Sequence, residues 1–73
     1  LIIYMPLQVT VELGNVRMSI KEILAFNLGS IIELDRMAED LVDVKVNGKL
    51  IARGEIVVVD ENYGVRITDI LSP

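Results

Sequence analysis

The sequence predicts a mainly β fold, a small barrel or sandwich with one short helix. Val, Ile and Leu dominate a chain that is 52% hydrophobic but only 4% aromatic, and such residues favour strands. Short alternating segments are separated by turn signals about every eight to twelve residues, which is typical of small β domains. With 73 residues the chain is too short for a second core, so residues 1–73 are expected to form a single domain.

The clearest strand is predicted at Leu7–Leu13, where aliphatic and polar side chains alternate. Gly14 and Asn15 form a turn signal, and Val16–Met18 resumes the alternation. These two segments are therefore expected to pair as a hairpin.

A short amphipathic helix is predicted to begin after Ser19. Ser19 stands three residues before Glu22, ahead of apolar residues at helical spacing, and this is the pattern of a capping box. The helix should end near Asn27. A further short strand is expected at Ile31–Leu34, followed by a charged loop.

Four carboxylates in and after this loop suggest two readings. Oxygen ligands suit Ca²⁺ and Mg²⁺, but the spacing differs from an EF-hand and the loop lacks its glycine. Acidic residues in a polar connection are usually solvated, so a plain charged loop is favoured over a metal site. The carboxylates belong to Asp35, Glu39, Asp40 and Asp43.

A second hairpin is predicted around Asn47-Gly48, a dipeptide that favours a type I′ turn. The alternating segment Val42–Val46 precedes it, and Leu50–Arg53 follows. A turn at Asp60–Gly64 and a last strand at 65–71 complete a tally of five or six strands.

Ile56–Val59 places four aliphatic residues in a row, so neither face of this strand is polar. Burial in a dimer core and a partly exposed binding patch both explain the run, and one reading can hold for each face. A mean hydropathy of +0.52 is high for so small a chain. Because the chain has no Cys for disulfides, a second subunit is expected to cover part of this surface.

Composition also excludes several functions. A net charge of −4 argues against nucleic acid and anionic lipid as partners. The absence of Cys and His removes thiolate nucleophiles and the usual zinc sites, and the isolated glycines form no phosphate cradle. No catalytic residue, cofactor or metal is predicted. A small-ligand-binding barrel or split-barrel enzyme remains the alternative from another class, and it would need a pocket with convergent polar groups.

No apolar stretch approaches the roughly 20 residues of a spanning helix, and no basic segment precedes Leu1–Leu7 as in a signal peptide. The chain begins with Leu and is expected to be a fragment of a longer protein.

Two longer stretches carry a resemblance to a known family: Leu7–Gly14 with Ile20–Leu24, and Val46–Val59 continued by Tyr63–Ile70. Over nearly its whole length the chain resembles the SpoA (surface presentation of antigens) domain shared by the flagellar motor switch proteins FliN and FliY and by type III secretion C-ring proteins.

The resemblance implies an intertwined homodimer of small β-barrels that swap segments and assemble into the cytoplasmic C-ring, peripheral to the inner membrane beneath the flagellar basal body. The implied roles are motility, chemotactic reversal with FliM, FliG and CheY, and docking of the export regulator FliH. The alternative is the C-ring of a type III secretion system.

The family's hydrophobic patch for protein binding falls on Ala38, Ile56, Val57 and Val58 of this sequence. Members commonly carry Gly-Glu-Pro after the patch alanine, whereas this chain has Glu39-Asp40-Leu41.

Overall fold

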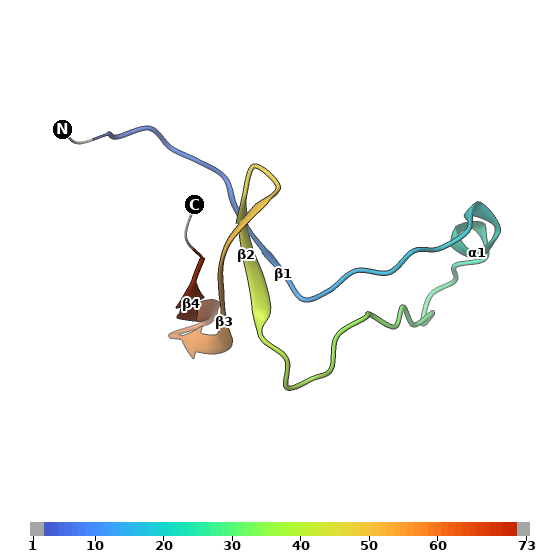
Figure 1. Cartoon of the computed structure of the whole chain (residues 1–73). Helices are drawn as coiled ribbons and strands as arrows, with labels where there is room; N and C mark the ends of the chain where they lie inside the picture. The colour runs from blue at the N-terminus through green and yellow to red at the C-terminus, as the bar shows by residue number, and fades with distance from the viewer. Residues whose placement is uncertain (1–2, 72–73) are drawn as a thin grey trace.

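The computed structural model describes residues 3–71 as a four-stranded antiparallel sheet with one short helix (Figure 1). The sheet order is β1-β2-β3-β4. The mainly β prediction with one short helix is confirmed. The sheet of the single chain is open at β1 and β4 and forms no closed barrel among the described residues. The elements are β1 (Val9–Glu12), α1 (Ile20–Leu24), β2 (Val42–Val46), β3 (Lys49–Val59) and β4 (Asn62–Ile70).

The Asn47-Gly48 hairpin is confirmed. Both turn residues have positive φ, 51° at Asn47 and 76° at Gly48, as a type I′ turn requires. The strand after the turn continues through Val59 instead of stopping at Arg53. The next turn is shorter than predicted, because Asn62 already pairs with Val59 at the start of β4.

The predicted hairpin between Leu7–Leu13 and Val16–Met18 is wrong. β1 pairs with β2 instead, with Val9 opposite Val46 and Glu12 opposite Asp43. After β1 the backbone of Asn15 turns to Asp35: the Asp35 amide donates to the Asn15 carbonyl at 3.2 Å, and the Asn15 amide donates to Asp35 Oδ1 at 2.8 Å. These bonds satisfy the backbone amide and carbonyl groups of Asn15, which would otherwise lie near the start of the predicted hairpin.

The predicted strand at Ile31–Leu34 is also wrong, since that segment has no strand pairing. The described residues therefore hold four strands instead of five or six. The helix begins as predicted. Ser19 Oγ accepts from the Glu22 amide at 3.1 Å and Glu22 Oε1 accepts from the Ser19 amide at 3.2 Å, which completes the capping box.

The helix ends at Leu24, three residues earlier than predicted. The Ala25 amide bonds to the Glu22 carbonyl and the Phe26 amide to the Ile23 carbonyl. These i to i−3 bonds tighten the last turn and finish the helix.

Residues 13–34, here called the arm, carry α1 away from the sheet (Figure 1). All six large aliphatic or aromatic side chains from Ile20 to Ile31 in the arm are exposed. The radius of gyration is 15.8 Å, whereas a compact domain of this length has about 11 Å. The helix α1 therefore packs against none of the described strands.

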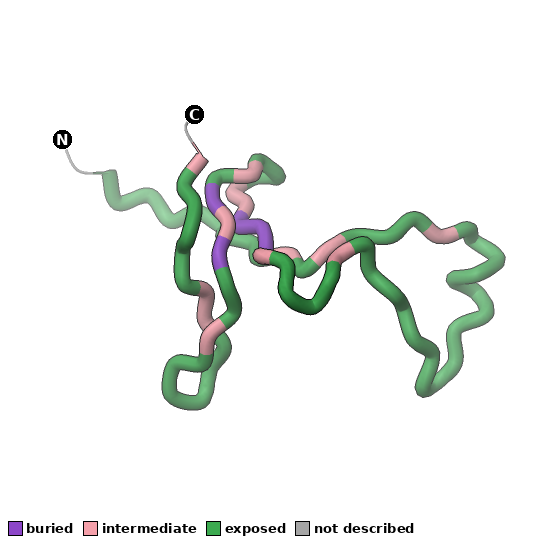
Figure 2. The backbone as a smooth tube through the Cα atoms, turned by 60° about the horizontal axis from the view of Figure 1, so that its bottom comes forward, coloured by how far each residue is buried: buried purple, intermediate pink, exposed green. Residues whose placement is uncertain are grey.

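The core is small and lies between β2 and β3 (Figure 2). Its buried hydrophobic side chains within residues 3–71 are Val42, Val44 and Ala52. The accessible surface is 6813 Å², about 2,300 Å² more than expected for a compact monomer of this mass. None of the helices in the described part of the chain is long and apolar enough to cross a membrane.

Candidate functional site

The strand register divides the sheet into an apolar face and a polar face. Successive side chains of a strand point to opposite faces, and the paired residues of neighbouring strands share a face. On this basis one face is apolar except for Lys49, which pairs with Val46 beside the β2–β3 turn, and we call it the apolar face. Its apolar side chains are Val9, Val11, Val42, Val44, Val46, Ala52, Ile56, Val58, Tyr63, Val65, Ile67 and Ile70.

The apolar face is largely uncovered in the single chain. A groove runs across it from β1 to β4, with Val9 and Val11 on one side and Val65 and Ile67 on the other. Ile56, which lies in this groove, is 43% exposed. Contiguous exposed apolar surface is typical of protein contact sites and of ligand-binding grooves.

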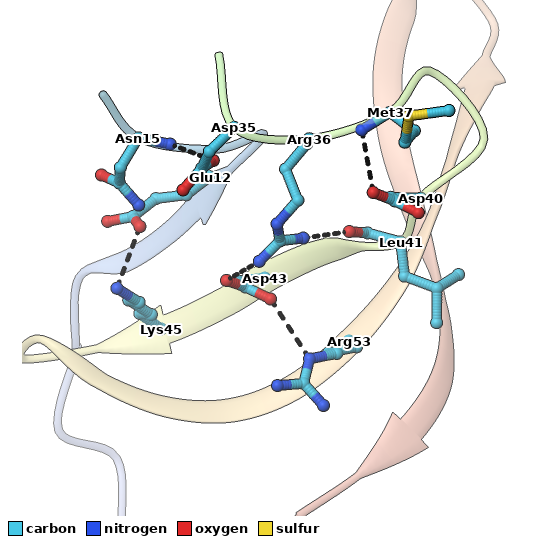
Figure 3. A network of polar contacts seen from close by, with 10 residues as sticks. All are labelled: Glu12, Asn15, Asp35, Arg36, Met37, Asp40, Leu41, Asp43, Lys45 and Arg53. Atoms are coloured by element: carbon cyan, nitrogen blue, oxygen red, sulfur yellow. Dashed lines mark hydrogen bonds and ion pairs between the residues drawn. The ribbon is translucent and has the colours of Figure 1, made fainter. Parts of the chain in front are cut away.

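The polar face carries cross-strand ion pairs. Lys45 Nζ lies 2.9 Å from Glu12 Oε2, and Arg66 Nη1 lies 2.8 Å from Glu55 Oε1. Towards the centre of the sheet, Asp43 is shared between two arginines (Figure 3). The charged side chains of this face therefore pair with one another, whereas many of the apolar side chains of the other face are left exposed.

The sequence-predicted patch on β3 is divided between the two faces. Ile56 and Val58 pair with Val65 and Tyr63 and lie on the apolar face, whereas Val57 lies on the polar face opposite Gly64. Val58 is 69% exposed and Val57 is half-buried. Since β2 pairs with β3 only as far as Gly54, residues 56–59 are paired by β4 alone and do not form a buried central strand of the protomer.

Val57 and Val59 form a small apolar area on the polar face. Gly64 lies opposite Val57, and a Cβ added to Gly64 would be 3.5 Å from Val57 Cγ2 and 3.2 Å from Val59 Cγ2. The missing side chain leaves these two valines accessible from above the sheet.

Ala38 lies in a separate loop, residues 35–41, which we call the Ala38 loop; its residues 37–40 are exposed. Met37 and Asp40 close a turn around Ala38 and Glu39: the Asp40 amide donates to the Met37 carbonyl at 3.1 Å, and the Met37 amide donates to Asp40 Oδ2 at 2.8 Å. The loop leads into Val42, which pairs with Gly54. The Ala38 loop and the patch on β3 therefore lie at the same end of the sheet.

Sequence reasoning missed the contact between Arg36 and Asp43. Asp43 is only 8% exposed, although it reads as an ordinary outward-facing residue between two valines. In the sequence, Arg36 is one of the charged residues of the predicted loop. The two side chains meet because the Ala38 loop turns back on the sheet, and no local pattern in the sequence signals that contact.

Three of the four carboxylates that could suggest a cation site form hydrogen bonds or ion pairs within the protein. Asp35 accepts from the Asn15 amide, Asp40 from the Met37 amide, and Asp43 from Arg36 and Arg53. Within residues 3–71 no group of three or more acidic, His or Cys side chains is placed to hold a metal.

Comparison with protein families gives one match that covers almost the whole chain. Residues 2–72 match the family described as "Type III flagellar switch regulator (C-ring) FliN C-term". The chain is 53% identical to the flagellar motor switch protein FliN of Escherichia coli over 73 residues, which is all of this chain and 53% of that protein. It is 52% identical to FliN of Pectobacterium carotovorum over 73 residues, 69% of that protein.

The chain is also 58% identical to the flagellar motor switch phosphatase FliY of Bacillus subtilis, over 67 residues that make up 92% of this chain and 18% of FliY. It thus spans about half the length of E. coli FliN and less than a fifth of FliY.

Two solved structures share the fold. The C-terminal domain of HrcQb from Pseudomonas syringae has a TM-score of 0.82 at 24% identity, covering 93% of this chain and 94% of that one. YscQ-C from Yersinia pseudotuberculosis has a TM-score of 0.76 at 28% identity, covering 93% and 80%.

Proposed function

Because the chain belongs to the FliN C-terminal family of type III flagellar switch regulators, we propose that it is a structural and switching component of the flagellar C-ring. The main support for this function is the family match over residues 2–72, together with identities above 50% to FliN proteins. The proposed roles are rotor assembly, chemotactic reversal and docking of the export apparatus. Its proposed location is the cytoplasmic face of the inner membrane, at the basal body.

The proposed form is an intertwined homodimer. The excess accessible surface is about 2,300 Å² per chain. For two copies this is about 4,600 Å², within the roughly 2,000–5,000 Å² that obligate homodimers bury in total. The arm presents apolar side chains with no partner, and the apolar face lacks a cover. Exchange of arms between two copies would satisfy both surfaces, which supports the segment-swapped arrangement.

The proposed docking surface combines Ala38 with the β3 patch of Ile56, Val57 and Val58. Val57 and the Ala38 loop are its accessible parts in the dimer, because Val57 lies on the face opposite the one that a second copy would cover. An amphipathic helix of a partner could place its apolar side on such a surface. FliH is the proposed partner for this surface, with FliM, FliG and CheY as partners of the assembled ring.

We assign no catalytic role to the chain. The two grooves on the apolar side of the sheet are lined almost wholly by aliphatic side chains, and a ligand-binding barrel would instead need converging polar groups. Native mass spectrometry of the purified protein tests this point, because a stoichiometric small molecule retained on the protein would favour the ligand-binding alternative.

A type III secretion C-ring is the second candidate function. The YscQ-C structure favours it, since its TM-score is 0.76 at 28% identity. The higher identity to FliN, 53% with the E. coli protein, supports the flagellar role.

A domain exchange separates the two roles. Residues 1–73 would replace the matching segment of E. coli FliN, and swimming in soft agar would be measured in cells that lack their own FliN. We expect swimming to be restored, with native FliN and an empty vector as controls. A parallel exchange into YscQ, scored by protein secretion, tests the alternative. Restored secretion with no restored swimming would contradict the flagellar assignment.

A further inference from the structure

The Ala38 loop is tied to the protein at three consecutive residues. Asp35 bonds to the backbone of Asn15, Arg36 reaches Leu41 and Asp43, and the Met37 amide donates to Asp40 (Figure 3). Ala38 follows directly, at the tip of the turn. The loop is therefore held in one conformation although its residues 37–40 are exposed.

Arg36 makes the contacts that join the loop to the sheet. Its Nη1 donates to the Leu41 carbonyl at 2.5 Å and its Nη2 donates to Asp43 Oδ2 at 2.5 Å. The planar guanidinium suits such a double contact, because its N–H groups diverge in a fixed fork. One side chain thus bridges the end of the loop and the second residue of β2.

Asp43 is the fixed point of this bridge. It is almost completely buried, and its other oxygen, Oδ1, accepts from Arg53 Nε at 3.3 Å. A buried carboxylate is costly unless charges and hydrogen bonds compensate it. Arg53 lies on β3 opposite Asp43, so the network ties the loop to β2 and, through Arg53, to β3.

We propose that Arg36 is a positioning residue for partner docking: it clamps the Ala38 loop to the polar face of the sheet and so sets the position of Ala38 relative to Val57. This inference rests on the proposed docking surface. The register supports it, because the clamped loop enters β2 opposite Gly54, and Val57 follows three residues further along β3. A loop released from the clamp would have to be ordered on each binding event, which weakens affinity.

The test compares Arg36→Gln with a matched control, Lys45→Gln. Each of the two side chains forms its own ion pair on the polar face, and they are similarly exposed, 27% for Arg36 and 26% for Lys45. Lys45, however, lies near the end of β2 that is away from the Ala38 loop. We expect R36Q to speed amide exchange at Met37 and Asp40 by roughly tenfold and to weaken capture of FliH by a similar factor. The dimer should persist in sedimentation, and K45Q should change neither measurement.

Arg36→Lys provides the second variant, since it keeps the charge and loses the fork. We expect it to fold as the dimer and still to exchange faster in the loop than the unaltered protein, because a single ammonium group replaces two diverging N–H groups. Unchanged exchange at Met37 and Asp40 in both Arg36 variants would overturn the clamp. Loss of the dimer in both would also overturn it, because Arg36 would then support the whole fold.

The clamp and the proposed function fail in different ways. If the unaltered protein does not capture FliH, the docking function is wrong, while amide exchange still decides whether Arg36 holds the loop. If R36Q loosens the loop but captures FliH as tightly as the unaltered protein, the docking function stands and the positioning role is overturned.

Discussion

Val57 lies directly opposite Gly64 in the β3–β4 ladder, on the face of the sheet that carries the ion pairs. Its neighbours Ile56 and Val58 lie on the apolar face. A run of aliphatic residues that looks uniform in the sequence is therefore split between two environments. In the proposed dimer, a second copy would cover the apolar face and Val57 would stay accessible to a different partner.

Val57→Asp is expected to abolish capture of FliH while the dimer persists. The new carboxylate would sit on the polar face, where it can remain hydrated in the free protein, but a docked apolar helix would strip that water away. Capture of FliH and sedimentation of the variant measure the two effects separately. Dissociation of V57D into protomers would contradict the assignment of Val57 to the open face.

Ile56→Asp is expected to destabilise the dimer itself. Ile56 lines the groove between β1 and β4, and covering a carboxylate there would cost a few kcal/mol without a partner charge. Sedimentation should show protomers or unfolded chain at concentrations where V57D remains dimeric. Val57→Asp is the matched control, since it introduces the same charge one residue away. Equal sedimentation of the two variants would argue against the division of faces.

Gly54→Ala is expected to destabilise the fold by roughly 1–3 kcal/mol, the usual cost of overpacking. Gly54 is buried, and an added Cβ would contact the Arg66 carbonyl oxygen and lie 2.6 Å from Val65 Cγ1. The backbone oxygen has little freedom to move within a paired strand. Chemical denaturation at a fixed protein concentration measures the loss.

Gly64→Ala is the control for this substitution. Its nearest neighbour would be Val59 Cγ2 at 3.2 Å, a side-chain atom at the sheet surface that can shift. G64A should therefore cost much less stability than G54A. Equal losses of stability in G54A and G64A would contradict this, because the cost would then not depend on how closely the added Cβ approaches its neighbours.

Local signals in the sequence were sufficient for some elements. The Asn47-Gly48 turn and the Ser19–Glu22 capping box involve neighbours within a few residues, so their geometry follows from residue type. The partner of β1 could not be predicted in this way. The alternation in Leu7–Leu13 defines a strand with one apolar face, but pairing with β2 depends on residues more than 30 positions away.

The candidate site was predicted in outline only. A resemblance indicated Ala38 and Ile56–Val58, but the separation of Val57 from Ile56 required the β3–β4 register, which the sequence pattern does not specify. Arg36 and Asp43 are seven positions apart, and their contact depends on how the Ala38 loop folds back onto the sheet. The path of the loop is set by hydrogen bonds such as those that Asp35 accepts from the Asn15 amide and Asp40 accepts from the Met37 amide.

The thermal stability of the chain is expected to rise with protein concentration. Within residues 3–71 the buried hydrophobic side chains of one protomer are two valines and one alanine, and these cannot offset the conformational entropy of so many ordered residues. If association supplies the missing burial, each tenfold increase in protein concentration adds about 1.4 kcal/mol of stability per dimer. Calorimetry over a hundredfold concentration range measures the shift in Tm. A constant Tm, with sedimentation showing a folded protomer at the lowest concentration, would mean that the open apolar face needs no second copy.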